Sequence, residues 1–124
     1  MNPEIILERG AIYYCKNLKL LIGKNGSETI KDKYVLILQG GSFYRKTDKV
    51  NILLGTSQRT DNIYPTDVLV KASDNGFPKD TKFNCSEIYI IKKVDILKSE
   101  YKFELNDNAM NEIGKTLIFA LQIV

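Results

Sequence analysis

Polar residues that could do chemistry stand in two places next to apolar, strand-like runs. Ser27 and Glu28 follow a turn-like stretch and precede Lys33, which leads into an apolar run. Thr56 ends the next apolar run and is followed by the polar stretch 57–59. These groups supply a carboxylate that can accept a proton, hydroxyls that can donate hydrogen bonds and cations that can hold an anion. They can act together only if the fold brings them to one surface.

The chain lacks the residue types on which most metal sites and much acid–base catalysis depend. It has no histidine, and its two cysteines, Cys15 and Cys85, lie far apart without a paired-ligand motif. Both cysteines stand in strand-like runs, so we expect buried, reduced thiols. We therefore predict no metal and no cofactor.

The charge pattern permits nucleic-acid binding without demanding it. The net charge is +3, and the positive residues are mostly lysines, with arginine only at positions 9, 45 and 59. A dedicated electrostatic binder shows a concentrated basic stripe, and bidentate clamping of phosphate is a property of arginine. Few such clamps are available here, and we expect most of the lysines on solvated surface.

The elements that must position these groups are mainly strands. The run 34–39 is apolar almost throughout, which is typical of a strand buried on both faces. The stretch 11–15 follows a turn signal and is rich in aromatic and β-favouring residues, whereas 18–22 is either the far arm of a hairpin or part of a long loop. Further strands are predicted at 49–56, 67–70, 81–84 and 87–92, turns at 24–27, 40–42 and 73–78, a loop at 57–64 and one helical turn at 94–97.

A helix is predicted near the C-terminal end of the sequence. Asn106 is its expected N-cap, and Asp107 complements the positive end of the helix. Apolar residues then recur at helical spacing, at Met110, Ile113, Leu117 and Leu121, with Ala120 filling the stripe. The order of elements predicts a mainly β (α+β) fold, in which a small, strongly bent antiparallel sheet or open barrel is covered by this helix.

The length and the hydropathy place limits on the whole chain. With 124 residues, we expect a single domain over 1–124 with an extra N-terminal segment at 1–8. No stretch is apolar for long enough to cross a bilayer, and the first residues do not form a signal peptide. The chain therefore reads as cytoplasmic, with no membrane partner.

Several motifs, taken in order and spacing, resemble the MazF/PemK/Kid family of toxin endoribonucleases. The resemblance runs from Arg9 to Leu121, and no single piece of it is specific by itself. The matching pieces are Arg9-Gly10-Ala11-Ile12-Tyr13, Gly26-Ser27-Glu28-Thr29, Leu54-Gly55-Thr56-Ser57, Pro65-Thr66-Asp67-Val68, Cys85-Ser86-Glu87-Ile88-Tyr89 and the helix with Met110, Glu112 and Ile113.

The resemblance implies a fold and an activity. The fold is an SH3-like β-barrel of the CcdB/MazF type with a C-terminal helix, assembled as a homodimer. Active members cut single-stranded RNA without a metal. A cognate antitoxin protein holds them inactive, with its C-terminal tail in the groove that would hold RNA.

The resemblance also implies which residues would act. Metal-free cleavage needs a base for the ribose 2′-hydroxyl, a donor set for the phosphorane charge and an acid for the leaving oxygen. Thr56 matches the strand-end threonine of the family, and Lys33 takes the place of its loop arginine. Glu28, the nearest carboxylate in that loop, is the expected base. Expected substrate-binding residues are Ser27, Ser57, Gln58, Arg59 and Tyr89.

Departures from the family pattern keep a second function open. Lys33 is a point charge where the family has a bidentate arginine, and Tyr89 stands where it has a second arginine. Asp67 replaces a histidine. The alternative is therefore a catalytically inactive relative that binds protein or nucleic acid or acts as a regulator. In that case Glu28 and Lys33 are ordinary surface charges, and the Thr56 hydroxyl bonds a neighbouring backbone group.

Overall fold

The computed structural model describes residues 7–22, 27–39 and 47–122. Most of the predicted turn at 24–27, the predicted break at 40–42 and most of the expected N-terminal segment at 1–8 fall outside these residues. The strands are β1 (Ala11–Ile22), β2 (Ser27–Ile37), β3 (Lys49–Thr56), β4 (Asp67–Val70), β5 (Thr81–Asn84), β6 (Tyr89–Lys92) and β7 (Glu100–Glu104). The helices are the short 3₁₀ turn η2 (Ala72–Asp74), α1 (Lys93–Leu97) and α2 (Asp107–Leu121).

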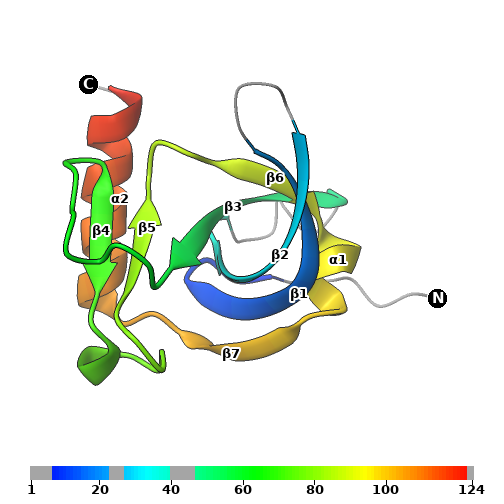
Figure 1. Ribbon diagram of the computed structural model, residues 1–124, viewed down its shortest axis with the longest axis horizontal. Coiled ribbons are helices and arrows are strands. Elements are labelled where there is room, and N and C mark those ends of the chain that lie inside the picture. Colours follow the sequence, from blue (N-terminus) through cyan, green and yellow to red (C-terminus); the bar gives the residue numbers. More distant parts are fainter. Residues whose placement is uncertain (1–6, 23–26, 40–46, 123–124) are drawn as a thin grey trace.

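The strands form one curled antiparallel sheet, a half-barrel with the C-terminal helix α2 against one side (Figure 1). The strand order is β4-β5-β3-β2-β1-β7, and β6 also pairs with β3. This is the mainly β fold with a C-terminal helix that the sequence predicts. The strands predicted at 49–56, 67–70 and 81–84 are confirmed at these bounds.

The sheet is covered on both faces around β2 and β3. Val35, Leu36 and Ile37 of β2 are all 0% exposed. Because successive side chains of a strand point to opposite faces, Val35 and Ile37 pack in one apolar cluster, and Leu36 packs in a second. The first cluster lies inside the curl of the sheet and includes Ile96 of α1, whereas the second includes Ile113 of α2. The prediction of a strand buried on both faces is confirmed.

The stretch 18–22 is neither a separate hairpin arm nor a loop, so both readings of it are corrected. It is the second half of β1, which pairs with β2 over its whole length apart from an irregularity between Cys15 and Leu18. Asn17 lies in this bulge with a φ of 57°, a left-handed conformation that asparagine tolerates. Its backbone N–H donates to Asp32 Oδ1 at 2.9 Å. The bulge bends the strand, which separates its two apolar halves in the sequence pattern.

The C-terminal helix follows its sequence signals closely. The Asn106 side chain accepts a hydrogen bond from the Ala109 N–H at 2.8 Å, which confirms the predicted N-cap. Ile113 is 0% exposed, so it carries the buried stripe, while Leu121 at the end of that stripe is 49% exposed.

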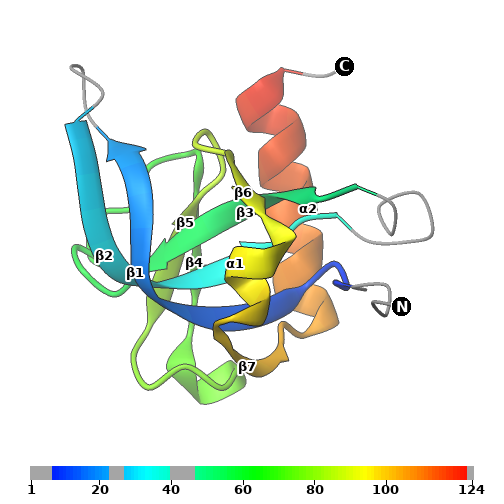
Figure 2. The same cartoon turned by 90° about the vertical axis from the view of Figure 1, so that its right-hand side faces the viewer.

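The remaining elements close one end of the curl. Figure 2 shows α1, the predicted helical turn, beside β6 and across β1, with both of which it is in contact. The sequence analysis misses β7, because its residues are largely polar and exposed, as suits a strand at a sheet edge. Both cysteines are buried and unpaired, as predicted. Among the described helices, none is both long and apolar enough to cross a membrane.

Candidate functional site

The fold places Lys33 and Thr56 side by side. The ladder between β2 and β3 ends at the pair Tyr34 and Gly55, and Lys33 and Thr56 occupy the next position on each strand. Thr56 is also directly opposite Lys82 of β5. Because opposite residues in a ladder share one face of the sheet, a threonine hydroxyl lies in a row between two lysines.

A glycine allows this close arrangement of β3 and β5. A Cβ atom on Gly55 would come within 2.8 Å of Thr81 Cγ2 and 3.0 Å of the Phe83 ring. Real side chains rarely approach so closely, so another residue here would force Thr81 and Phe83 of β5 to shift next to Thr56. Gly55 therefore helps to set the distance between the threonine and the neighbouring strand.

The Thr56 hydroxyl keeps its proton available. Its oxygen accepts a hydrogen bond from the Gln58 N–H at 3.2 Å, a local turn typical of serine and threonine at strand ends. A hydroxyl has one hydrogen to donate and two lone pairs. With one lone pair used by Gln58, the hydroxyl can still donate to an anion. The Thr56 hydroxyl can therefore bond the neighbouring backbone and donate to a phosphate at the same time.

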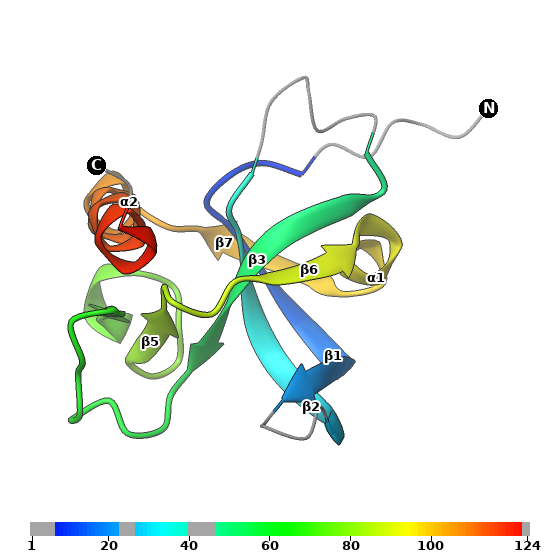
Figure 3. The ribbon, with the colours of Figure 1, turned by 90° about the horizontal axis from the view of Figure 1, so that it is seen from above.

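The loop 57–66 carries three of the expected substrate-binding residues. Ser57, Gln58 and Arg59 are all exposed. Arg59 has a φ of 54°, and its carbonyl accepts the Asn62 N–H at 3.1 Å. Seen from above, this loop and the β1–β2 hairpin both extend to the same side of the sheet, with the end of β3 between them (Figure 3).

Lys82 and Asp67 form a charged pair that the sequence analysis did not identify as part of the site. The two side chains are 13% and 5% exposed, and Lys82 Nζ lies 3.8 Å from Asp67 Oδ2. Lys82 Nζ also donates to the Asn62 carbonyl at 3.0 Å. The pair thus holds loop 57–66 against β5. The available sequence signal was the alternation in β5, where Lys82 stands between the buried Thr81 and Phe83.

The fold does not bring Ser27 and Glu28 to Thr56. Their backbones lie near the tip of the β1–β2 hairpin, opposite Ile22 and Leu21. Five positions, or roughly 16 Å of strand, separate Glu28 from Lys33 along β2. The structure describes only the backbone of these two residues, and their roles stay predictions.

Tyr89 is part of the sheet rather than a free surface residue. It pairs with Ile52 of β3 and packs on the cluster inside the curl. Its hydroxyl donates to Glu87 Oε2 at 3.4 Å. Burial, aided by the Glu87 charge, raises the pKa of the Tyr89 hydroxyl. The side chain is therefore neutral at ordinary pH and supplies a hydroxyl and a ring face, but no charge.

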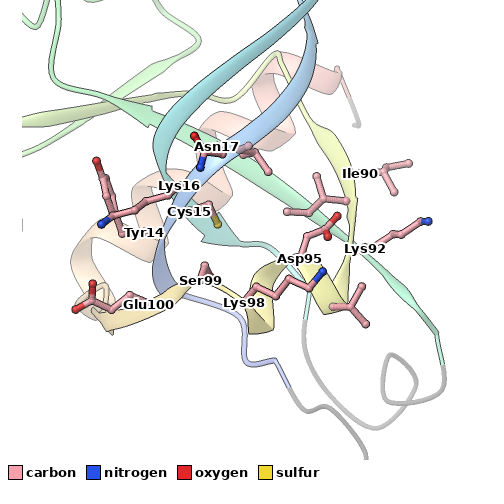
Figure 4. Close-up of a pocket in the computed structure, with 13 residues that line it drawn as sticks. Tyr14, Cys15, Lys16, Asn17, Ile90, Lys92, Asp95, Lys98, Ser99 and Glu100 are labelled. Carbon is pink, nitrogen blue, oxygen red and sulfur yellow. The ribbon is translucent and has the colours of Figure 1, made fainter.

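A hollow of about 1000 Å³ lies beside this site rather than at it. It opens between β1, β6, α1 and the start of β7, and Figure 4 shows its lining with Cys15 among the labelled residues. Cys15 is opposite Lys33 in the ladder. Burial raises the pKa of the Cys15 thiol, so it remains protonated at neutral pH and makes a poor nucleophile.

Acidic and cysteine side chains do not gather into a metal-binding group anywhere in the described part of the chain. The groups near Thr56 are hydroxyls, ammonium groups and one carboxylate that is already paired. Such a set binds and polarises an anionic substrate such as a phosphodiester.

Comparisons with known proteins bear on the family and the fold of the chain. The family model described as PemK-like, MazF-like toxin of type II toxin–antitoxin system matches residues 8–121. No curated protein matches the chain.

Solved structures similar to the chain include proteins from mycobacteria and from Deinococcus radiodurans. An endoribonuclease in complex with its cognate antitoxin, from a mycobacterial species, is 26% identical, with a TM-score of 0.70 over 94% of this chain and 95% of that one. A second mycobacterial endoribonuclease is 24% identical, with a TM-score of 0.70 over 95% and 93% of the two chains. A MazE–MazF crystal structure from Deinococcus radiodurans is 14% identical, with a TM-score of 0.70 over 97% and 99%. The last two support the fold alone.

Proposed function

The chain belongs to the family of PemK-like, MazF-like toxins of type II toxin–antitoxin systems, and from this premise we propose that it is an endoribonuclease that cuts single-stranded RNA without a metal. The observation that carries the proposal is the position of Lys33, within β2, next to Thr56 at the end of β3. The Lys33 ammonium and the Thr56 hydroxyl thus lie on neighbouring strands, and the hydroxyl can still donate its hydrogen because its oxygen accepts from the Gln58 N–H.

The proposed reaction is an attack of the ribose 2′-hydroxyl on the adjacent phosphorus. Lys33 and Thr56 hold the non-bridging phosphate oxygens and stabilise the charge that develops on them. The 2′-oxygen forms a bond to phosphorus, and the bond from phosphorus to the 5′-oxygen breaks. The products are a 2′,3′-cyclic phosphate on one fragment and a 5′-hydroxyl on the other.

The 2′-hydroxyl loses a proton as it attacks, and the leaving 5′-oxygen takes up a proton from water. We assign the removal of the 2′-hydroxyl proton to Glu28, which requires its carboxylate to reach the phosphate held by Lys33, roughly 16 Å away along β2. We assign contacts to the RNA to Ser27, Ser57, Gln58, Arg59 and Tyr89. An RNA chain that runs along β2, from the end of β3 towards the hairpin tip, would pass Lys33 and then Glu28. The hairpin and loop 57–66 would flank it (Figure 3).

The proposed partners follow from the family. We propose that an antitoxin protein neutralises this chain, since the mycobacterial structure at 26% identity is of an endoribonuclease with its cognate antitoxin. We further propose that the chain folds as a single domain, forms a homodimer and acts in the cytoplasm, where single-stranded RNA is available.

Expression in a bacterial host tests the function in cells. We expect the wild-type chain to arrest growth and Thr56→Val, which removes the hydroxyl but keeps the shape, to relieve the arrest. Thr56→Ser retains the hydroxyl and should arrest growth as the wild type does. If the wild type is present in soluble form but leaves growth and cellular RNA unchanged, the proposal fails, and the alternative of a catalytically inactive binding protein is correct.

A further inference from the structure

Tyr64 presents an aromatic ring to solvent on the loop that begins at Thr56. Its relative exposure is 60%, and the neighbouring Ile63 is 43% exposed. No aromatic ring of a described residue packs against it, whereas Tyr14, Tyr34 and Tyr13 each contact another ring. Exposure of one ring on a surface is ordinary by itself. Tyr64 differs from an ordinary exposed tyrosine in the hydrogen bonds that hold it.

The backbone at Tyr64 is fixed on both sides. The Tyr64 N–H donates to Asp67 Oδ2 at 3.0 Å, and the Asp67 N–H donates to the Tyr64 carbonyl at 2.9 Å. The Asn62 amide donates to the Tyr64 hydroxyl at 3.3 Å. Lys82, in turn, bonds the Asn62 carbonyl and pairs with Asp67. An exposed ring whose backbone is fixed in advance loses little freedom when a ligand packs on it.

The position of this loop relates it to the proposed cleavage site. Lys82, which anchors the loop, is directly opposite Thr56 in the β3–β5 ladder. The loop leaves the end of β3, passes β5 and returns into β4 on the side of the sheet towards which the β1–β2 hairpin also extends (Figure 3). A single-stranded RNA whose phosphate is bound at Thr56 would therefore have the loop that carries Tyr64 to one side.

We propose that Tyr64 is a stacking platform for an unpaired base of the RNA, held in place by Asp67 and Lys82. Unpaired bases are recognised largely by stacking on exposed aromatic rings, and such stacking tolerates any base because every base has a π face. Asp67 and Lys82 act as positioning residues that fix the loop. The inference rests on the proposed function, because it takes single-stranded RNA as the ligand.

The chain contains no tryptophan, which allows a direct spectroscopic test. We would make Tyr64→Trp and, as a matched control, Tyr101→Trp, since Tyr101 is 53% exposed and lies on β7, at the other end of the strand order from β4. The probe is a 2′-O-methyl oligonucleotide of randomised sequence, which lacks the attacking hydroxyl and is not cut. We expect saturable quenching of the tryptophan in Tyr64→Trp and no quenching in Tyr101→Trp.

A binding measurement accompanies this test. With fluorescein-labelled probe, Tyr64→Leu should weaken binding about tenfold, Tyr64→Phe should bind as the wild type does, and Tyr101→Leu should bind normally. In the Tyr64→Trp protein, Lys82→Met should reduce the quenching, and Lys82→Arg should preserve it. Equal quenching at both tryptophans, or normal binding by Tyr64→Leu, would overturn the stacking role.

The two proposals fail in different ways. If the wild type neither binds the probe nor cuts RNA, the proposed function fails and the stacking role fails with it. If the wild type cuts RNA and binds the probe but the Tyr64 variants are unchanged, the function stands and only the stacking role is refuted.

Discussion

At the scale of single residues, the site depends on one hydroxyl and on the kind of cation next to it. The Gln58 N–H donates to the Thr56 oxygen at 3.2 Å, so this oxygen is held in place before a substrate arrives, while its hydrogen can still turn towards an acceptor. Lys33 supplies a compact ammonium, whereas a guanidinium would present two parallel donors to a phosphate. The sequence was sufficient to propose both residues, because Thr56 ends an apolar run and Lys33 leads into one.

The choice of lysine at position 33 predicts a gain of activity. Lys33→Arg should raise the rate of RNA cleavage by about tenfold, because a bidentate donor holds the phosphate in a better-defined geometry. Lys33→Met should lower the rate by about a hundredfold, the cost of losing one oriented donor to a developing charge. Single-turnover cleavage of a fluorescent RNA in EDTA measures both. Equal rates for Lys33→Met and the wild type would remove Lys33 from the mechanism.

The buried Cys85 thiol should make the free energy of unfolding depend on pH. Burial, aided by the Asp67 charge, raises the pKa of the Cys85 thiol to about 11. In the unfolded chain the thiol ionises near pH 8.5, roughly the value for a free cysteine. Between these values the unfolded chain holds fewer protons, so the free energy of unfolding falls as pH rises. The contribution is complete below the unfolded pKa and is lost as pH approaches the folded one.

Urea unfolding between pH 8 and pH 11 measures this loss. The wild type should lose on the order of 2 kcal/mol more over this range than Cys85→Ala does. The difference between the two proteins is the relevant quantity, because the tyrosines titrate in both. Parallel curves would show that the thiol does not ionise differently in the two states.

At the scale of elements, periodicity predicted most strands, and two features escaped it. The bulge at Asn17 divides β1 into two apolar halves, so its second half did not read as the same strand. The edge strand β7 is largely exposed and polar, so it lacks the apolar run by which the inner strands were found. The charged pair of Lys82 and Asp67 depends on a contact between β5 and the start of β4, and this contact appears only when the sheet is assembled.

The approach of β3 to β5 predicts opposite effects of alanine at two glycines. Gly55→Ala should reduce the free energy of unfolding by about 1–3 kcal/mol, because the new methyl group would meet Thr81 and Phe83 at 3.0 Å or less. It should also slow RNA cleavage, since β5 must move away from Thr56. Gly114→Ala, within α2, should instead stabilise the protein by up to about 1 kcal/mol.

Chemical denaturation and the cleavage assay together check this pair. A Cβ atom on Gly114 would meet only Arg9 Nη2, at 3.7 Å, so the site has room for it. If Gly55→Ala were as stable and as active as the wild type, the close packing next to Thr56 would have no bearing on the site.

At the scale of the whole molecule, the fold brings two of the predicted site residues together and places two others away from them. The curled sheet puts Lys33 beside Thr56, whereas Ser27 and Glu28 lie near the hairpin tip. The sequence could not reveal this separation, because it depends on how far β2 extends past the end of β3. Lys33 and Thr56 therefore form the centre of the proposed site, and the hairpin and loop 57–66 form its two sides (Figure 3).

The most direct test of this account is incubation of the purified protein with a long, unstructured RNA in EDTA, followed by analysis of the ends. The account predicts cuts that leave 2′,3′-cyclic phosphate and 5′-hydroxyl ends. Thr56→Ser should still cut, and Thr56→Val should cut about a hundredfold more slowly. Intact RNA with the folded wild type, or equal cleavage by Thr56→Val, would contradict the claim that this hydroxyl and the lysine beside it cut RNA.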